Sequence, residues 1–357
     1  MEASYNIFIN KILTTAAKRQ ASNIHLTVGA YPALRIDDQL VELKDEPIVS
    51  DELVKKLADD WLNSDQKKAL EKAREITLVK ELGKKFRVKI NFFFQKNFLS
   101  AALRLIPQQI PALINLGLAK SVYGLTEKKS GLIIVAGPYG SGRTTTVAAL
   151  IEEINKNRKV NILTVEKPIE YIFTSKVGLV EQREVGRDVN SFTDALAYAG
   201  QADVDVVSVG LASETEVIPL VLDFANSGRL ALLTLDTISA TQTIEEILAS
   251  FPPADKQRAQ LLLAEGLLAV IVQRLVPKAG GGLALAAEIL IATEAVSSLI
   301  REGRVKQLTT VLQSSRAEGM LSLDQSLAEL VKSGEVLIDQ AIEYANDPEN
   351  FRARAKT

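Results

Sequence analysis

The stretch GLIIVAGPYGSGRTTTVAALIEEI, residues 131–154, constrains the fold of this chain more than any other part of the sequence. An apolar run typical of a buried strand is followed by a glycine-rich turn and then by residues with helical periodicity. The turn, residues 137–144, matches the phosphate-binding loop pattern G-x-x-x-x-G-K-[ST] except that Arg143 replaces the lysine. Taken alone, the match also fits a plain strand-to-helix turn. Its place between a strand and a helix favours a phosphate-binding loop in an α/β fold.

The chemistry expected of this loop depends mainly on its backbone. Glycines allow successive N–H groups to point into one concave nest, and the following helix adds the positive end of its dipole. Thr144 is expected to hold Mg²⁺ through its hydroxyl if a nucleotide binds. Arg143 keeps the charge of lysine but presents a broad planar guanidinium, so weak or absent binding of ATP and Mg²⁺ is expected. The nucleotide-binding candidates are Gly137, Gly140, Ser141, Gly142, Arg143, Thr144 and Thr145.

The hydrophobic pattern divides the chain into a smaller α+β part and a larger α/β part. Tracts long enough for helical crossovers separate four β-rich runs, LIIVAG, NILTVEKP, VDVVSVG and RLALLTLDT, which predicts a mostly parallel sheet covered by helices on both faces. After about residue 241 the pattern is almost wholly helical, and DKQRAQLLLAEGLLAVIVQRLV is expected to be an amphipathic helical stretch. The expected parts are an α+β domain at 1–105, a linker at 106–122, an α/β domain at 123–275 and its helical C-terminal part at 276–357.

Composition argues against several classes of protein. The chain has 357 residues, 47% hydrophobic content and a formal net charge of −2, as is ordinary for a globular protein. Without a net basic charge, nucleic acid is not expected as the main partner. With no cysteine, the chain can form neither disulfides nor thiolate zinc sites. The N-terminus shows no basic segment followed by an apolar core, so no signal peptide is expected and the chain is interpreted as cytoplasmic.

Similarity to a known family is distributed over five stretches: ASNIHLTVGAYPALRIDDQL, GLIIVAGPYGSGRTTTVAALIEEI, ILTVEKPIEYIF, QREVGRDVNSFTDAL and EGMLSLDQSLAELVKSG. They resemble the type IV pilus retraction ATPases, a branch of the hexameric secretion ATPase superfamily, in order and over nearly the whole chain. The resemblance implies a PAS-like domain at 1–105 followed by a RecA-like ATPase domain. It also implies a ring of six subunits with ATP bound between them. The expected location is the inner face of the cell membrane, where the ring docks on the pilus platform protein.

Positions that this family uses for hydrolysis are changed here. Glu166 corresponds to a glutamate that activates water, but its acidic neighbour is replaced by Lys167, whose ammonium is expected to hold Glu166 ionised and make it a weaker base. Leu211 replaces the essential glutamate after the Walker B strand and can neither organise Mg²⁺ nor orient water. Asp236 replaces a histidine, and its charge is expected to repel phosphates. Family arginines are also replaced by Ala197, Gln201 and Ser213.

Two arginines of the N-terminal part have two open interpretations. Arg87 and Arg104 match arginines that, in the family, reach the nucleotide of a neighbouring subunit. They also fit ordinary charges at strand edges. Gln273 matches a family glutamine and is expected to be structural.

Together these patterns predict a degenerate member of the pilus retraction family. The expected role is a non-hydrolysing or weakly active subunit of a homomeric or mixed hexamer, or a regulator of the motor, acting with an active retraction ATPase paralogue or the platform protein. One alternative is an active motor that uses Arg143 and Glu166. A second is a nucleotide-sensing or structural ring protein with no role in pili.

Overall fold

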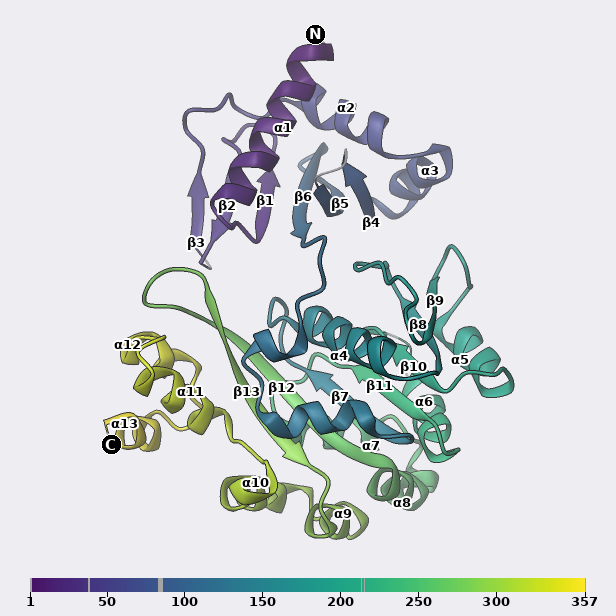
Figure 1. Ribbon diagram of the computed structural model, residues 1–357. Helices are drawn as coiled ribbons and strands as arrows, with labels where there is room; N and C mark the ends of the chain where they lie inside the picture. Colours follow the sequence, from purple (N-terminus) through teal and green to yellow (C-terminus); the bar gives the residue numbers. More distant parts are fainter. Residues whose placement is uncertain (1, 38, 83–85, 213, 215, 357) are drawn as a thin grey trace. The chain divides into compact units, whose positions relative to one another are not determined.

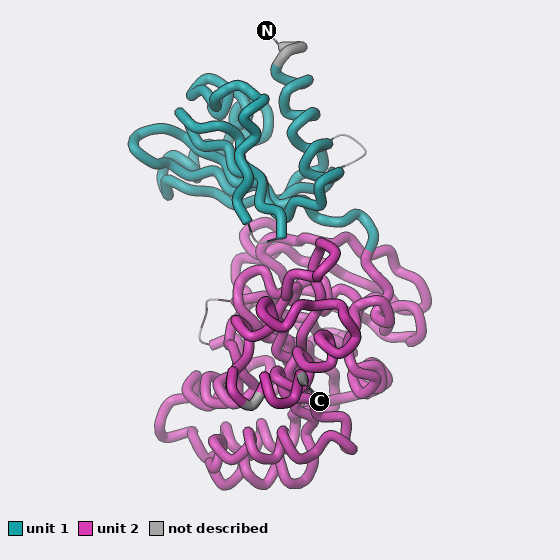
Figure 2. The backbone as a smooth tube through the Cα atoms, turned by 90° about the vertical axis from the view of Figure 1, so that its left-hand side faces the viewer, with its two compact units in different colours: residues 1–109 teal, residues 110–357 magenta. Residues whose placement is uncertain are grey.

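The computed structural model describes residues 2–37, 39–82, 86–212, 214 and 216–356, and Figure 1 shows its ribbon. The chain forms two compact units, Met1–Gln109 and Ile110–Thr357, which are coloured separately in Figure 2. The boundary falls inside the segment 106–122 that the sequence predicts as a linker. Most of that segment belongs to the second unit, because the turns η1 (Leu113–Leu116) and η2 (Lys120–Glu127) pack on helix α4 (Arg143–Asn157).

The first unit is an antiparallel sheet packed against helices. As far as the unit is described, its six strands run in the order β3-β2-β1-β6-β5-β4. Residues of α1 and α2, including Ile12 and Leu57, are fully buried with Ile90 of the sheet. The helices are α1 (Glu2–Lys18), α2 (Asp51–Trp61) and α3 (Ser64–Ala73). The strands are β1 (Asn23–Leu26), β2 (Ala33–Ile36), β3 (Gln39–Glu42), β4 (Glu75–Leu82), β5 (Phe86–Gln95) and β6 (Phe98–Ile106).

The second unit is built on a mostly parallel sheet. Among the described residues, seven strands run in the order β13-β12-β7-β11-β10-β8-β9, and the edge pair β12 and β13 is antiparallel. The strands are β7 (Gly131–Ala136), β8 (Asn161–Glu166), β9 (Leu179–Glu184), β10 (Val206–Val209), β11 (Leu230–Thr234), β12 (Leu267–Pro277) and β13 (Leu283–Ile291). The four β-rich runs of the sequence form β7, β8, β10 and β11, which confirms that prediction.

Helices cover both faces of this sheet. Successive side chains of β7 alternate between two cores, with Ile134 in one and Ile133 in the other. The first core is filled by α5 (Phe192–Gln201), α6 (Val217–Asn226), α7 (Ala240–Ala249), α8 (Lys256–Gly266) and α9 (Glu294–Arg301). Helix α4 and the turns η1 and η2 fill the second core. The chain is therefore an α/β protein with helices on either side of a central sheet.

One long segment differs from its predicted structure. The stretch at 255–276 was expected to be helical throughout, but only α8 is a helix and Leu267–Pro277 is strand β12. The strand contains the β-branched run Val270, Ile271 and Val272, which is buried on both faces and pairs in parallel with β7. A continuous apolar run of this kind fits a buried strand as well as a buried helix, so periodicity could not separate the two.

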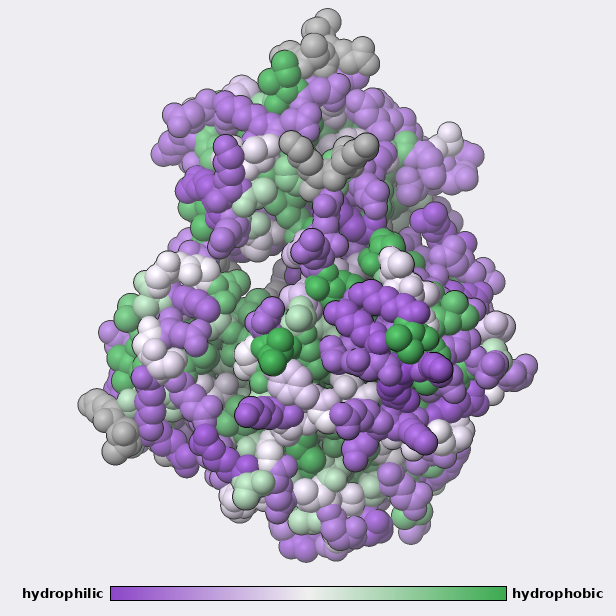
Figure 3. Space-filling model, viewed as in Figure 1, coloured by the Kyte–Doolittle hydropathy of each residue, from purple (hydrophilic) through white to green (hydrophobic). Residues whose placement is uncertain are grey.

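The part at 276–357 was expected to be helical, but it also contains strand β13, which pairs with β12, and its remaining helices form a small core of their own. After β13 come η4 (Val305–Gln307), α10 (Leu308–Ser314), η5 (Arg316–Glu318), α11 (Leu323–Lys332), α12 (Ile338–Ala341), η6 (Ile342–Tyr344) and α13 (Pro348–Lys356), while η3 (Pro253–Asp255) precedes α8. In the described ranges, none of the helices combines the length and apolar character needed to cross a bilayer. On the face drawn in Figure 3, apolar residues form small groups among hydrophilic ones.

Candidate functional site

The predicted site residues converge at one edge of the second sheet. In parallel strands the carboxyl ends lie at the same edge. The register pairs Val135 of β7 with Thr234 of β11, and Val209 of β10 with both Leu233 and Val165 of β8. The phosphate-loop sequence, Asp236 and Leu211 therefore follow the neighbouring strands β7, β11 and β10, and Glu166 ends the next strand, β8.

The glycine-rich loop joins β7 to α4 through residues that need positive φ. Gly137, Gly140 and Gly142 have φ values of 145°, 82° and 90°. A Cβ atom on Gly137 would lie 2.5 Å from the Ser141 Oγ and 2.6 Å from the backbone oxygen of Gln273, so only glycine fits there. The loop is thereby held tightly against strand β12.

The loop presents backbone N–H groups that have no protein acceptor. Helix α4 begins without a side-chain cap at its N-terminus. Within the described part of the chain, the amides of Gly140, Gly142, Thr144 and Thr145 donate no hydrogen bond to protein. Ser141 is buried and its hydroxyl also lacks a partner among the described residues. Unpaired donors at the positive end of a helix form a site for an anion.

Arg143, the positively charged residue of the loop, is hydrogen-bonded to a residue outside the loop. The Arg143 Nη1 donates a 2.7 Å hydrogen bond to the carbonyl oxygen of Leu235, just beyond the end of β11. The side chain of Arg143 is half-buried in this position. One nitrogen of the guanidinium is therefore used to tie α4 to the segment that contains Asp236.

Two threonines that follow also have protein partners. The Oγ1 of Thr145 lies 3.1 Å from the hydroxyl of Tyr171, and the Oγ1 of Thr146 accepts a 2.7 Å hydrogen bond from Gln273 Nε2. Gln273 is fully buried in β12, in keeping with a structural role. Thr144 is half-buried and is placed in the first turn of α4, where its hydroxyl could bind a cation held by phosphates.

Glu166 ends strand β8 and is held by neighbouring donors. Its Oε1 accepts hydrogen bonds from Thr164 Oγ1 at 2.8 Å and from Gln182 Nε2 at 3.4 Å. Burial raises the pKa of Glu166 to about 7, and the charge of Glu170 adds to the effect, although the hydrogen bonds oppose it. The expectation that Lys167 holds Glu166 ionised is wrong in direction, because Lys167 is exposed and burial dominates.

This raised pKa predicts a pH-dependent gain in stability for Glu166→Gln. The folded chain binds a proton at this carboxyl more tightly than the unfolded chain, so the stability it contributes is present at low pH and lost as pH rises through about 7. The uncharged variant should exceed the natural chain in free energy of unfolding by about 1–2 kcal/mol near pH 8.5. Urea unfolding should show almost no difference at about pH 4, below the ordinary pKa of the carboxyl. An equal gain in free energy of unfolding at both pH values would contradict the raised pKa of Glu166.

Leu211 and Asp236 each lie two residues beyond the end of a strand, β10 and β11. Gly210 donates its N–H to the Val165 carbonyl at 2.9 Å, so Leu211 directly follows a position next to Glu166, and its side chain is 47% exposed. Asp236 is exposed after β11, and its charge adds to the burial that raises the pKa of Glu246 in α7. The arginine replacement at Ser213 lies outside the described residues.

Arg87 and Arg104 belong to the first unit. Arg87 on β5 forms an ion pair with Glu81 of β4 at 3.2 Å, and Arg104 on β6 is paired in register with Lys89 and Asn23. Both arginines are half-buried on their strands. Their reach toward a nucleotide in a neighbouring subunit stays a prediction.

The residues of the loop fit a phosphate group. The free amides of Gly140, Gly142, Thr144 and Thr145 would hold the phosphates of ATP, with Thr144 as the protein ligand of Mg²⁺. In the described ranges no three His, Asp or Glu side chains gather as a metal site, so the phosphates themselves would carry most of the metal. Bound ATP would supply a γ-phosphoryl group for transfer to water. Glu166 at the end of β8 and Asp236 after β11 are carboxylates at this edge of the sheet.

Two residues of this site were not recognised from the sequence. Tyr171 and Gln182 connect Glu166 with the first turn of α4 through hydrogen bonds. Gln182 lies in the stretch QREVGRD that carries part of the family resemblance, but its role depends on where β9 pairs. Tyr171 lies in the stretch ILTVEKPIEYIF, which also carries part of the resemblance, but its contact with Thr145 depends on how the segment after β8 packs on α4.

Comparison with known proteins covers nearly the whole chain. The family described as type II/IV secretion system protein matches residues 2–342. The chain is 37% identical over 343 residues to the type IV pilus retraction ATPase PilT of Pseudomonas aeruginosa, which covers 96% of this chain and 99% of the relative. It is 35% identical over 344 residues to a twitching motility protein of Neisseria gonorrhoeae, covering 96% and 92% of the two chains.

A solved structure agrees with these relatives. The crystal structure of the pilus retraction motor PilT with bound ADP matches with a TM-score of 0.82 at 38% identity, over 96% of this chain and 98% of that chain. At 96% coverage of this chain, the match includes residues of both units. The chain therefore belongs to the type II/IV secretion system protein family, and within that family it is PilT-like.

Proposed function

We propose that this chain is a member of the pilus retraction ATPases whose hydrolytic activity is lost or very weak. It would consist of a PAS-like domain and a RecA-like domain, assemble in a hexameric ring, and bind nucleotide weakly in the glycine-rich loop. The observation that carries the proposal is the hydrogen bond from Arg143 to the Leu235 carbonyl, beside Leu211 and Asp236 at the neighbouring strand ends. Charge needed to stabilise a phosphoryl transition state is thus diverted or replaced.

The partners follow from the family rather than from the site. A catalytically weak ring subunit would act on a pilus motor by mixing with an active retraction ATPase paralogue, or by docking on the platform protein at the inner face of the cell membrane. The bound ADP in the related PilT structure supports a nucleotide as the ligand of this loop. The free amides described above support the same ligand.

A second candidate function has one observation in its favour. Burial places the pKa of Glu166 at about 7, which is near the optimum for a general base at neutral pH. An active motor could therefore use Arg143 and Glu166 with a rearranged metal site. This candidate predicts turnover that disappears in Glu166→Gln.

The two functions are separated by an assay of phosphate release with purified chain. We expect the chain alone to be at background, about 100-fold or more slower than an active retraction ATPase of the same organism. Calorimetry should give a Kd for Mg-ADP of about 1 mM or weaker. Mixing with the active paralogue should change that paralogue's rate. Turnover by the chain alone that is lost in Glu166→Gln would replace the first function by the second.

A further inference from the structure

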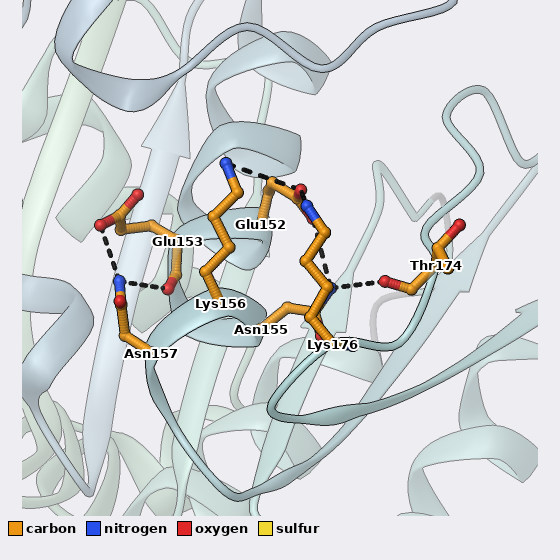
Figure 4. A network of polar contacts seen from close by, with 7 residues as sticks. All are labelled: Glu152, Glu153, Asn155, Lys156, Asn157, Thr174 and Lys176. Carbon is orange, nitrogen blue, oxygen red and sulfur yellow. Dashed lines mark hydrogen bonds and ion pairs between the residues drawn. The ribbon is translucent and has the colours of Figure 1, made fainter.

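The segment between β8 and β9 is attached to helix α4 at two levels. Near the C-terminal half of the helix, Asn155 Nδ2 donates to the Thr174 carbonyl at 2.9 Å, and Glu152 forms an ion pair with Lys176 (Figure 4). Near the N-terminus, the Thr145 Oγ1 and the Tyr171 hydroxyl are 3.1 Å apart. Any displacement of α4 would therefore be transmitted to residues 171–176.

The attachment near the N-terminus of α4, between Thr145 and Tyr171, lies at the phosphate loop. Thr145 is in the first turn of α4, and its backbone N–H is one of the unpaired donors of the loop. Tyr171 is buried, with 4% of its surface exposed. A phenylalanine would fill the same volume, so the phenolic hydroxyl adds a hydrogen bond that packing alone does not require.

A glutamine continues this connection to Glu166. The side chain of Gln182, on β9, donates from Nε2 to the Tyr171 carbonyl at 2.9 Å and to Glu166 Oε1 at 3.4 Å. Its Oε1 accepts the N–H of Phe173 at 2.8 Å. One amide group thus fixes the backbone on either side of Ile172 and one oxygen of the Glu166 carboxylate.

We infer that Tyr171 and Gln182 are positioning residues that hold Glu166 in register with the phosphate loop. The path runs from Thr145 through the Tyr171 hydroxyl and backbone to Gln182 and then to Glu166. Changes in the first turn of α4, such as those that accompany filling of the loop, reach the carboxylate by this path. The inference rests on the proposed site, but it concerns the coupling between its parts and not hydrolysis.

The pKa of the Glu166 carboxyl is the quantity that tests this inference. The groups that face it are Thr164 of β8, Gln182 of β9, and the N–H and carboxylate of Glu170 in the intervening segment. Burial keeps its pKa at about 7. If the segment is released from α4, water reaches the carboxyl and its pKa falls toward the ordinary value.

The test titrates the ¹³C-carboxyl resonance of Glu166 in the full chain, assigned by its loss in Glu166→Gln. We expect Tyr171→Phe and Thr145→Val each to lower the titration midpoint by about one pH unit, and the double variant to lower it no further. The hydrogen bond removed in both variants joins Thr145 to Tyr171, and Gln182 lies between Tyr171 and Glu166, so a common, non-additive shift identifies the path. Having two single variants guards against one that fails to fold.

The matched control is Lys176→Met, which removes the ion pair between the same segment and Glu152 of α4 and leaves the Asn155 hydrogen bonds in place. It should leave the midpoint unchanged, because Lys176 is not on the path. An equal shift in this control, unchanged midpoints in Tyr171→Phe and Thr145→Val, or additive shifts would each overturn the inference. No nucleotide is used, so a failure of ATP binding or hydrolysis would be seen in the other assay and would leave this result independent.

Discussion

Replacing Arg143, Leu211 and Asp236 together by lysine, glutamate and histidine is expected to raise ATP hydrolysis by about 100-fold over the natural chain. The lysine ammonium is compact and can turn into the loop, whereas the Arg143 guanidinium donates to the Leu235 carbonyl. A glutamate at position 211 follows Gly210, whose added Cβ would lie 3.6 Å from the Cα of Glu166. It would restore a carboxylate that can orient water and metal-bound groups.

The single variants define the control for this experiment. Groups that act as one unit in catalysis have strongly non-additive effects, so Arg143→Lys alone should remain at background while Leu211 is present. Phosphate release by each variant at saturating Mg-ATP provides the measurement. A folded triple variant that is no faster than the natural chain would show that other replacements, such as Ala197 or Gln201, limit the reaction. It would also show that the replacements at positions 143, 211 and 236 do not by themselves explain the loss of ATP hydrolysis.

Gly137→Ala is expected to lower the free energy of unfolding by about 3–4 kcal/mol. The residue has a φ of 145°, and an added Cβ would meet the backbone oxygen of Gln273 at 2.6 Å. Strand β12 is fully buried there and paired with β7 and β13, so its backbone cannot move aside at low cost. The steric clash and the unfavourable φ therefore both lower the free energy of unfolding of this variant.

Gly140→Ala provides the matched comparison in the same loop. Gly140 has a φ of 82°, but nothing lies within 4 Å of an added Cβ. Only the backbone strain remains, and the expected loss is about 1 kcal/mol. Urea unfolding of the two variants beside the natural chain provides the measurement. Equal losses would show that the close approach of the loop to β12 has no energetic consequence.

Several features of the fold could be predicted because their signals are local. The apolar runs of β7, β8, β10 and β11 are each bounded by loop residues, and the glycines of residues 137–142 occur at fixed spacing. Strand β12 was not predicted, because its apolar run has the same appearance in a buried helix. This segment becomes a strand because it pairs with β7, which lies far earlier in the chain.

The candidate site shows the same division. The retained Glu166 and the replaced residues at positions 143, 211 and 236 were each identified from their neighbours in sequence, and parallel pairing explains why their strands end together. The pKa of Glu166 could not be derived in this way. Its neighbour Lys167 suggested an ionised carboxylate, while burial and the charge of Glu170 raise the pKa.

The sequence by itself determined the α/β class, the position of the phosphate loop, the family, and the identity of the replaced residues, since all of these are written in short ordered patterns. Tertiary structure alone decided that Arg143 bonds to Leu235, that Tyr171 meets Thr145, and that Gln182 reaches Glu166. The physical reason is distance along the chain. A hydrogen bond forms only within about 3.5 Å, and the positions that satisfy it are set by strand order and packing rather than by periodicity.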